Sequence, residues 1–305
     1  MTIVTITLNP CIDKTVSVAQ ILPNCKLACR DVGAYPGGGG LNVARVITRL
    51  GIDVSAYWTC GGENGRKLGQ FLDAEKVRHL PIPIAASVRE NLIVQEESSG
   101  NLFRFGMPGP LLAETERNQW REQVRQIPSS TQYVVFSGSL PEGTPPEWYG
   151  ELLRMVPEGI HVVVDTKMAA LRHALAVGVY LIKPNVRELE ELVGRELTDD
   201  TAIEQAVREI IDRRGAEVVL LSLGRAGVIL ATKDGLERIS APSVHLRSKV
   251  GAGDAVVGGL LSALSRGMAL LEAAKFGVAA GAAAVMTEGT ELCRSEDAEQ
   301  LFKQM

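Results

Sequence analysis

The feature that most constrains the fold is a series of short apolar runs that alternate with helical segments from about residue 115 onward. The runs read YVVFSG, HVVVDT, VYLIKPN and EVVLLSLG, and each is apolar at consecutive positions rather than at every second one. Strands of this kind are buried on both faces, as in a parallel sheet that helices cover on both sides. With TIVTITL at the start of the chain as a further strand, the sequence predicts an α/β fold with a doubly wound, mostly parallel sheet.

Two early segments, residues 14–35 and 87–106, do not follow this alternation of strands and helices. The first holds strand-like runs around TVSV and LACRDV, and the second holds NLIVQEESSGNLFRF, in which Ser-Ser-Gly predicts a hairpin turn. We expect the two segments to pair into a small sheet inserted twice into a single domain of residues 1–305. A sheet this thin cannot bury a core of its own, so it serves either as a lid or as an oligomer interface. Because we expect apolar residues on both of its faces, we predict a homodimer through this sheet.

Composition narrows the classes of function. Apolar residues make up 46% of the chain, charged residues 22%, and the formal net charge is −4. These values are typical of a soluble globular protein and argue against a nucleic-acid partner. The opening MTIVTITLNP lacks the features of a signal peptide, and the Ala-rich run at 277–285 is too short to span a bilayer. Five scattered cysteines without a CxxC pair favour free thiols, so we expect a cytoplasmic protein that does not bind membranes.

Polar residues gather where the predicted strands end. They are Asn9 and Asp13, then Ser137, Gly138 and Ser139, then Asp165, then Lys183, Pro184 and Asn185, and finally Ser222 and Gly224. Ligands bind at the carboxyl ends of the strands in open α/β sheets, so these residues predict a ligand site along one edge. Ordinary turn chemistry is the alternative, since strand ends need turn residues.

Two glycine-rich turns lead into helices, PGGGGLNVA at 36–44 and VGAGDAVVGG at 250–259. Neither completes the GxGxxG pattern of dinucleotide-binding proteins, and the chain contains no GxxxxGK[ST] loop. Both turns offer free backbone N–H groups at a helix N-terminus, where anions bind. Tight turns that allow close helix packing are the alternative interpretation.

Asp254 follows the second turn at once. An acid in the first turn of a helix is favoured by the helix dipole, which is the simplest explanation for it. A carboxylate beside a bound phosphate would repel it, however, unless a hydroxyl group lay between the two. Asp254 would then accept the hydroxyl proton while the alkoxide attacks a phosphoryl group that faces the amides of residues 251–254. The pattern therefore favours phosphoryl transfer onto a sugar hydroxyl.

Three motifs, in this order along the chain, resemble those of the ribokinase-like (PfkB) carbohydrate kinases. They are PGGGGLNVARVITRLG, KPNVRE at 183–188 and VGAGDAVVGGLL. The resemblance runs along essentially the whole chain. It implies a doubly wound α/β domain with a β-sheet lid, and transfer of the γ-phosphoryl group of ATP to a sugar alcohol with magnesium.

Within the family, TLNPCID, FSGSLPEG and LIKPNVREL are most similar to the phosphosugar branch. The 1-phosphofructokinases and tagatose-6-phosphate kinases of that branch usually carry Gly-Lys-Gly where this chain has Gly38-Gly39-Gly40. PGGGG, NLIVQEESSGNLFRFGMPG and GTELC resemble the ribokinase-type 6-phosphofructokinases. The implied reaction is phosphorylation of fructose 6-phosphate at its 1-hydroxyl. The other two sugar-phosphate kinases are alternatives, as is a non-catalytic sugar-phosphate sensor, against which the intact GAGD sequence argues.

The resemblance also implies roles for individual residues. Asp254 would be the general base, with Gly251, Ala252 and Gly253 as the anion hole. The sugar would be held by Asp13, Gly38, Gly39, Asn42 and Ser139, and its phosphate by Arg89, Arg104 and Lys26. The ATP site would be lined by Lys183, Asn185, Ser222, Gly224 and Gly227, with Glu188 acting on magnesium through water.

Many relatives bind a monovalent cation, potassium being the expected one, beside the anion hole. Its carbonyl ligands would come here from Ser248, Val250, Ala284 and Gly289. Two positions depart from the family pattern near this site. Lys249 stands where a threonine is common, and Glu291 stands where the nearest relatives have a basic residue. Taken as a whole, the resemblance implies a sugar phosphate and ATP as partners, with potassium as a further ligand.

Overall fold

A computed structural model describes residues 2–305, and its elements alternate as the apolar runs predict. The strands are β1 (Thr2–Thr7), β2 (Cys11–Val18), β3 (Arg30–Gly37), β4 (Val54–Cys60), β5 (His79–Pro83), β6 (Arg89–Glu96), β7 (Leu102–Phe105), β8 (Thr131–Ser137), β9 (His161–Asp165), β10 (Val179–Ile182), β11 (Ala216–Ser222), β12 (Val228–Thr232) and β13 (Gly235–Ile239). The helices are α1 (Gly39–Arg49), α2 (Gly62–Ala74), α3 (Glu114–Arg125), α4 (Glu147–Arg154), α5 (Met168–Val177), α6 (Val186–Val193), α7 (Asp200–Asp212), α8 (Ala252–Ser265), α9 (Leu270–Val285) and α10 (Ser295–Phe302), with a short 3₁₀ turn at Gly224–Ala226.

The large sheet has nine strands in the order β13-β12-β11-β10-β9-β8-β1-β4-β5. Every neighbouring pair from β11 to β5 is parallel, whereas β12 and β13 run antiparallel at one edge. The prediction of a mostly parallel sheet is confirmed. The antiparallel edge was not predicted, because the prediction rested on strands that alternate with helices. β12 and β13 are joined by a short turn with no helix between them.

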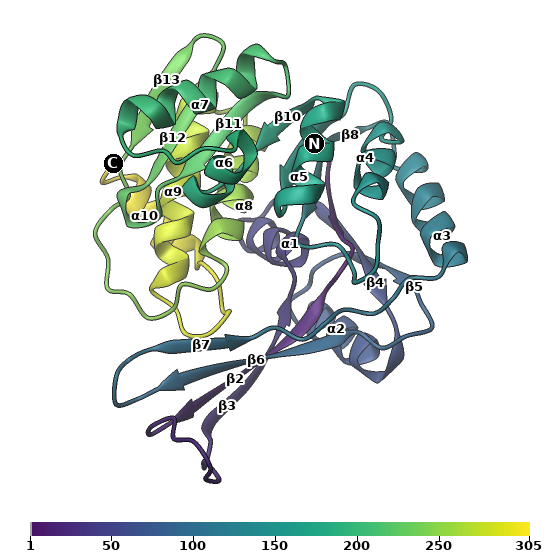
Figure 1. Cartoon of the computed structure of the whole chain (residues 1–305), viewed down its shortest axis with the longest axis vertical. Coiled ribbons are helices and arrows are strands. Elements are labelled where there is room, and N and C mark those ends of the chain that lie inside the picture. Colours follow the sequence, from purple (N-terminus) through teal and green to yellow (C-terminus); the bar gives the residue numbers. More distant parts are fainter. Residues whose placement is uncertain (1) are drawn as a thin grey trace.

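Helices cover both faces of this sheet, so the doubly wound arrangement is confirmed (Figure 1). One apolar core packs residues of α1, α2, α8, α9 and α10 against the sheet, and a second packs residues of α3 to α7 against the other face. On α1 the residues at helical spacing, Val43, Val46 and Ile47, are fully buried. Glycines let α8 and α9 approach closely, since a Cβ on Gly277 would lie 2.6 Å from the carbonyl oxygen of Val256.

The two early segments form a separate four-stranded sheet in the order β3-β2-β6-β7, as predicted. β2 pairs with β6 in parallel, and each forms an antiparallel pair with its other neighbour. Figure 1 shows this sheet projecting from the α/β body beside α2. The hairpin at 91–105 is confirmed. The strand predicted around LACRDV was placed too early, because residues 26–29 form no regular structure and β3 begins at Arg30.

The four-stranded sheet is not apolar on both faces, which corrects the prediction. Asp13 and Asn91 lie opposite each other across the β2–β6 pair, and Arg104 lies opposite Ile93 one strand further. Side chains alternate along a strand, so these polar residues share the face toward the α/β body, while Phe103 and Phe105 lie on the other face. Only the outer face is therefore apolar, and it stays exposed at Phe103 and Phe105.

Candidate active site

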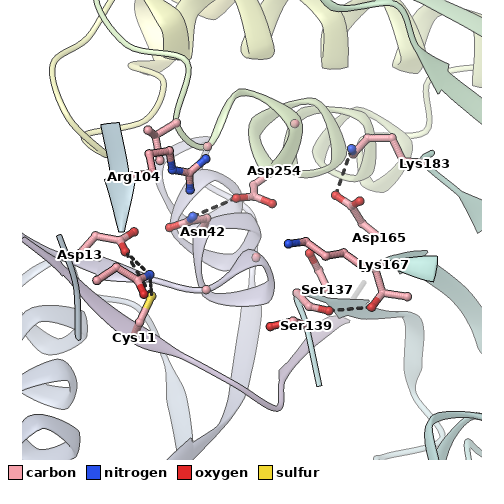
Figure 2. Close-up of a pocket in the computed structure, with 18 of the residues that line it drawn as sticks. Cys11, Asp13, Asn42, Arg104, Ser137, Ser139, Asp165, Lys167, Lys183 and Asp254 are labelled. Carbon is pink, nitrogen blue, oxygen red and sulfur yellow. Dashed lines mark hydrogen bonds and ion pairs between the residues drawn. The ribbon is translucent and has the colours of Figure 1, made fainter. Parts of the chain in front are cut away.

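A cavity of about 330 Å³ lies between the carboxyl ends of the large sheet, the start of α8 and the inner face of the four-stranded sheet. Its wall contains Cys11, Asp13, Gly38, Gly39, Asn42, Arg89, Asn91, Arg104, Ser137, Gly138, Ser139, Asp165, Thr166, Lys167, Lys183, Glu188, Val250, Gly251, Gly253 and Asp254. Residues from the ends of β8, β9 and β10, both glycine turns and the four-stranded sheet thus meet at one place (Figure 2).

Asp254 lies in the first turn of α8 and faces this cavity. Burial, and then the charge of Asp165, raise the pKa of its carboxyl group from the ordinary 3.8 to about 7. The side-chain amide of Asn42 donates a hydrogen bond to Asp254 Oδ2 at 2.9 Å and works against that rise. A carboxyl group with a pKa near neutrality can take a proton from a substrate hydroxyl and later release it to solvent.

A buried ion pair supports Asn42 from behind. Arg45 donates from Nη1 to Asn42 Oδ1 at 3.1 Å, and its Nη2 lies 2.7 Å from Glu75 Oε1. The Arg45 side chain is 1% exposed. The hydrogen bond from Arg45 fixes the side-chain oxygen of Asn42, so the NH₂ group of Asn42 points toward Asp254.

The turn before Asp254 requires glycine at two positions. Gly251 caps α8 in the left-handed region with φ 77, and a Cβ there would lie 2.3 Å from Leu292 Cδ2. A Cβ on Gly253 would lie 3.1 Å from the ammonium of Lys183. The free N–H groups at this helix start, together with Lys183, make the α8 end of the cavity favourable for an anion.

Lys183 and Asp165 form an ion pair of 3.1 Å at the end of β9 and β10. Burial disfavours the charge on Lys183, but Asp165 and Asp254 outweigh it and hold the pKa of Lys183 above its usual range. Burial and Asp165 raise the pKa of Glu188, whose carboxylate accepts a hydrogen bond from the Asn185 amide at 2.9 Å. Asn185 and Glu188 form a reciprocal cap at the start of α6.

The opposite end of the cavity is built from the four-stranded sheet. Arg89 donates to the side-chain oxygens of Asn9 at 3.0 Å and Asn91 at 2.9 Å. Asn91 in turn donates to Asp13 Oδ1 at 2.8 Å. Arg104 comes from β7, and Figure 2 shows it above Asn42 and to one side of Asp254. Two guanidinium groups on one side of a cavity suit a phosphate, whose oxygens match their planar forks.

The glycine turn before α1 forms the floor of the cavity. Gly38 has φ 115, which favours glycine, and a Cβ on Gly39 would lie 2.2 Å from Ser137 Oγ. Ser139 Oγ accepts a hydrogen bond from Asn9 at 3.1 Å. Substrate atoms can therefore approach the backbone of residues 38 and 39 without meeting a side chain.

Several predicted site residues lie outside the cavity wall. Lys26 is exposed in the irregular segment between β2 and β3 and does not line the cavity, whereas Arg89 and Arg104 do. Ala252, the first residue of α8, does not line the cavity either. The wall also lacks Asn185, Ser222, Gly224 and Gly227. A β-bridge joins Asn185 to Ser222, and the 3₁₀ turn follows β11.

The carbonyl groups predicted to bind a monovalent cation lie around the start of α8 and the end of α9. Two of them already accept hydrogen bonds: Gly289 O from Ser248 Oγ at 2.6 Å, and Ala284 O from Thr287 Oγ1 at 2.9 Å. Glu291 pairs with Arg294 at 3.0 Å, which partly neutralises its charge.

The structure adds four cavity residues to which the sequence analysis gave no role: Cys11, Asn91, Thr166 and Lys167. Asn91 is identified by its pairing with Asp13 across two strands, which are far apart in the sequence. Thr166 and Lys167 follow Asp165 at the end of β9, so a wider reading of the strand-end pattern would have found them.

Comparison with known proteins agrees with this geometry. The pfkB family carbohydrate kinase domain matches residues 3–297. The ATP-dependent 6-phosphofructokinase isozyme 2 of Mycobacterium tuberculosis is 40% identical over 302 residues, which cover 99% of this chain and 89% of that protein. The Escherichia coli isozyme 2 is 39% identical over 302 residues, which cover 98% of this chain and 97% of that protein.

Solved structures of the E. coli phosphofructokinase-2 also match. Its complex with substrates and products has a TM-score of 0.95 at 39% identity and covers 100% of this chain and 99% of that one. Its complex with potassium has a TM-score of 0.94, and its tetrameric inhibited form has a TM-score of 0.93. The chain is a member of the pfkB family of carbohydrate kinases, with the ribokinase-like fold.

Proposed function

We propose that this protein transfers the γ-phosphoryl group of ATP to the 1-hydroxyl of fructose 6-phosphate. The observation that carries this proposal is that one cavity holds the partly buried carboxyl group of Asp254 beside a helix N-terminus at one end and two arginines at the other. The first end suits a hydroxyl and a transferring phosphoryl group, and the second suits a phosphate already present on the sugar. The two relatives with this activity in their names support the same reaction.

In this proposal the sugar lies across the floor formed by Gly38 and Gly39, with its 6-phosphate on Arg89 and Arg104 and its hydroxyls near Asp13, Asn42 and Ser139. Asp254 accepts the proton of the 1-hydroxyl as that oxygen forms a bond to the γ-phosphorus. The bond to the bridging oxygen breaks, and its electron pair leaves on ADP. The amides at residues 251–254 stabilise the charge on the phosphoryl oxygens during transfer.

We assign the nucleotide to the side of Lys183, Asn185, Ser222, Gly224 and Gly227. Within residues 2–305 no cluster of three or more His, Cys, Asp or Glu side chains could hold a metal ion. Magnesium, which keeps several waters and binds substrate phosphates, needs no such cluster. Glu188 beside Asp165 fits a water-mediated contact, and magnesium would there neutralise charge on the ATP phosphates.

We also propose that potassium binds the carbonyls of Ser248, Val250, Ala284 and Gly289. The potassium complex of the E. coli protein supports this assignment. A carbonyl oxygen has two lone pairs, so the hydrogen bond from Ser248 leaves one acceptor site on Gly289. At Ala284 the oxygen accepts from both the hydroxyl and the backbone N–H of Thr287, so potassium would replace one of these hydrogen bonds.

The four-stranded sheet is proposed as a lid over the sugar and as the contact of a homodimer, within a single domain of residues 1–305. Its outer face exposes Val32 by 73%, Phe105 by 47% and Phe103 by 37%. A second copy is the occupant we assign to this face, because the E. coli relative forms a tetramer in its inhibited form. No helix in residues 2–305 is long and apolar enough to cross a membrane.

Release of ADP with a panel of sugars tests the function. We expect fructose 6-phosphate to give the highest kcat/KM, and unphosphorylated fructose to be a poor substrate. Faster turnover of tagatose 6-phosphate or fructose 1-phosphate would assign the chain to one of the two alternative kinases. No ADP release with any sugar phosphate, although sugar phosphate binds, would favour the non-catalytic sensor.

A further inference from the structure

Lys167 is a cation in the cavity wall that none of the assignments above uses. It follows β9 by two residues and precedes the first turn of α5. Figure 2 shows its side chain extending into the cavity, where the residue remains exposed to solvent. Among residues 2–305 its ammonium group has no hydrogen-bond or ion-pair partner, although an ammonium offers three donors.

The other cations of the wall differ from Lys167 in their contacts or their position. Lys183 is paired with Asp165, and Arg89 is bound to Asn9 and Asn91. Arg104 belongs to the four-stranded sheet, at the end assigned to the sugar phosphate. Lys167, which follows β9 of the large sheet, is thus an unpaired cation of this wall at the end away from the sugar phosphate.

The charges of the two proposed ligands, and not a net charge of the wall, point to an anion as the partner of Lys167. Four carboxyl side chains, Asp13, Asp165, Glu188 and Asp254, face four cations, Arg89, Arg104, Lys167 and Lys183. Both proposed ligands carry phosphates, and transfer concentrates negative charge on three phosphoryl oxygens. A free ammonium on the nucleotide side, within electrostatic reach of Glu188, can neutralise part of that charge.

We propose that Lys167 binds the γ-phosphoryl group of ATP and remains bound to it through the transition state, as a catalytic residue of this chain. The inference rests on the proposed kinase function. In the reaction the sugar oxygen bonds to the γ-phosphorus, its proton passes to Asp254, and ADP leaves with the electron pair of the broken bond. Lys167 exchanges no proton and contributes hydrogen bonds and positive charge to the transferred group.

The test compares Lys167→Met, which keeps the length but removes the charge, with Lys167→Arg, which keeps the charge. Lys233→Met serves as the matched control, since Lys233 is exposed in the turn between β12 and β13 and is absent from the cavity wall. Because Lys167 is also exposed, all three variants should fold, which a thermal melt verifies. Calorimetry without sugar then measures the Kd of ADP and of the non-hydrolysable analogue AMP-PNP, both with magnesium.

We expect Lys167→Met to raise the Kd of AMP-PNP by about 10-fold or more, which is the usual scale for a lost hydrogen bond to a charged group. The Kd of ADP should change by less than about 2-fold. With fructose 6-phosphate as acceptor, kcat should fall by about 10- to 100-fold, Lys167→Arg should restore part of it, and Lys233→Met should match wild type. Equal losses for ADP and AMP-PNP, unchanged binding of both, or an effect on the KM for the sugar alone would overturn the assignment. Because the binding arm needs no turnover, failure of the kinase proposal would be seen separately, as absence of wild-type activity.

Discussion

Replacement of Asp254 by asparagine should stabilise the folded protein while it abolishes most of the activity. The pKa of Asp254 is about 7 in the folded protein and 3.8 in an unperturbed carboxyl group. A carboxyl group with a raised folded pKa takes up a proton on folding, so its contribution to stability is full below pH 3.8 and is lost as the pH rises toward about 7. Above that range the buried charge destabilises the fold.

The size of the effect follows from the two pKa values. The difference between about 7 and 3.8, at 1.36 kcal/mol per pKa unit, amounts to about 4 kcal/mol at pH 8. Asparagine carries no charge, and its amide oxygen can still accept the hydrogen bond from Asn42. The value of about 7 already includes the attraction between the Asp254 carboxylate and the charge of Lys183. We therefore expect a rise in Tm of several degrees at pH 8 and little change at pH 4.

The activity of the same variant should fall by on the order of 10²-fold or more in kcat, the usual scale for a lost general base. In the wild type, kcat/KM should fall as the pH drops below about 7, because the protonated carboxyl group of the free enzyme cannot act as a base. Melting curves at the two pH values and initial rates measure these effects. If Asp254 served only to favour its helix N-terminus, asparagine would cost roughly 1 kcal/mol or less of stability and leave turnover nearly intact. A lowered Tm with near-normal kcat would therefore refute the catalytic assignment.

Three further predictions concern the rest of the site and the outer face of the four-stranded sheet. Arg104→Ala should raise the KM for fructose 6-phosphate by about 10-fold or more and leave the KM for ATP nearly unchanged. Lys14→Ala, on the opposite face of the same sheet, is the control. A matching rise of both KM values in Arg104→Ala would contradict a sugar-phosphate role. Gly251→Ala should lower both Tm and kcat, since Gly251 has φ 77 and a Cβ there would meet Leu292. The control Gly267→Ala, with φ 82 and open space around it, should lose about 1 kcal/mol of stability but keep its kcat. Equal kcat values for the two variants would argue against an anion-binding turn. If the proposed homodimer forms through this sheet, Phe103→Asp should convert it to monomers, as measured by light scattering. Leu80→Asp, at a similarly exposed position on β5, should leave the assembly unchanged. A wild type that is monomeric at micromolar concentration with full activity would exclude the dimer.

The parts of the site that could be predicted from the sequence are those that lie within one local motif. Asp254 follows Gly251 and Gly253 directly, so the base and its anion-binding turn are neighbours in the chain as well as in space. The doubly wound sheet was predictable for a similar reason, since its buried strands are apolar at consecutive positions.

What could not be predicted depends on contacts between distant segments. Asn91 reaches the site because β6 pairs with β2, and no short-range pattern encodes that register. Arg45 lies between apolar residues of α1 and supports Asn42 only because Glu75, directly after the end of α2, offers a carboxylate to its buried guanidinium. Lys26 was grouped with Arg89 and Arg104 by resemblance, but it lies in an irregular segment that its own chain does not bring to the cavity.

The central claim is that this cavity joins a phosphoryl group to the free hydroxyl of a sugar that is already phosphorylated. Phosphorus NMR of wild-type protein with ATP, magnesium and fructose 6-phosphate tests it most directly. We predict that ADP and a second phosphomonoester on the sugar appear in equal amounts. ATP that stays intact, or ADP that accumulates with inorganic phosphate and no new sugar phosphate, would contradict the account.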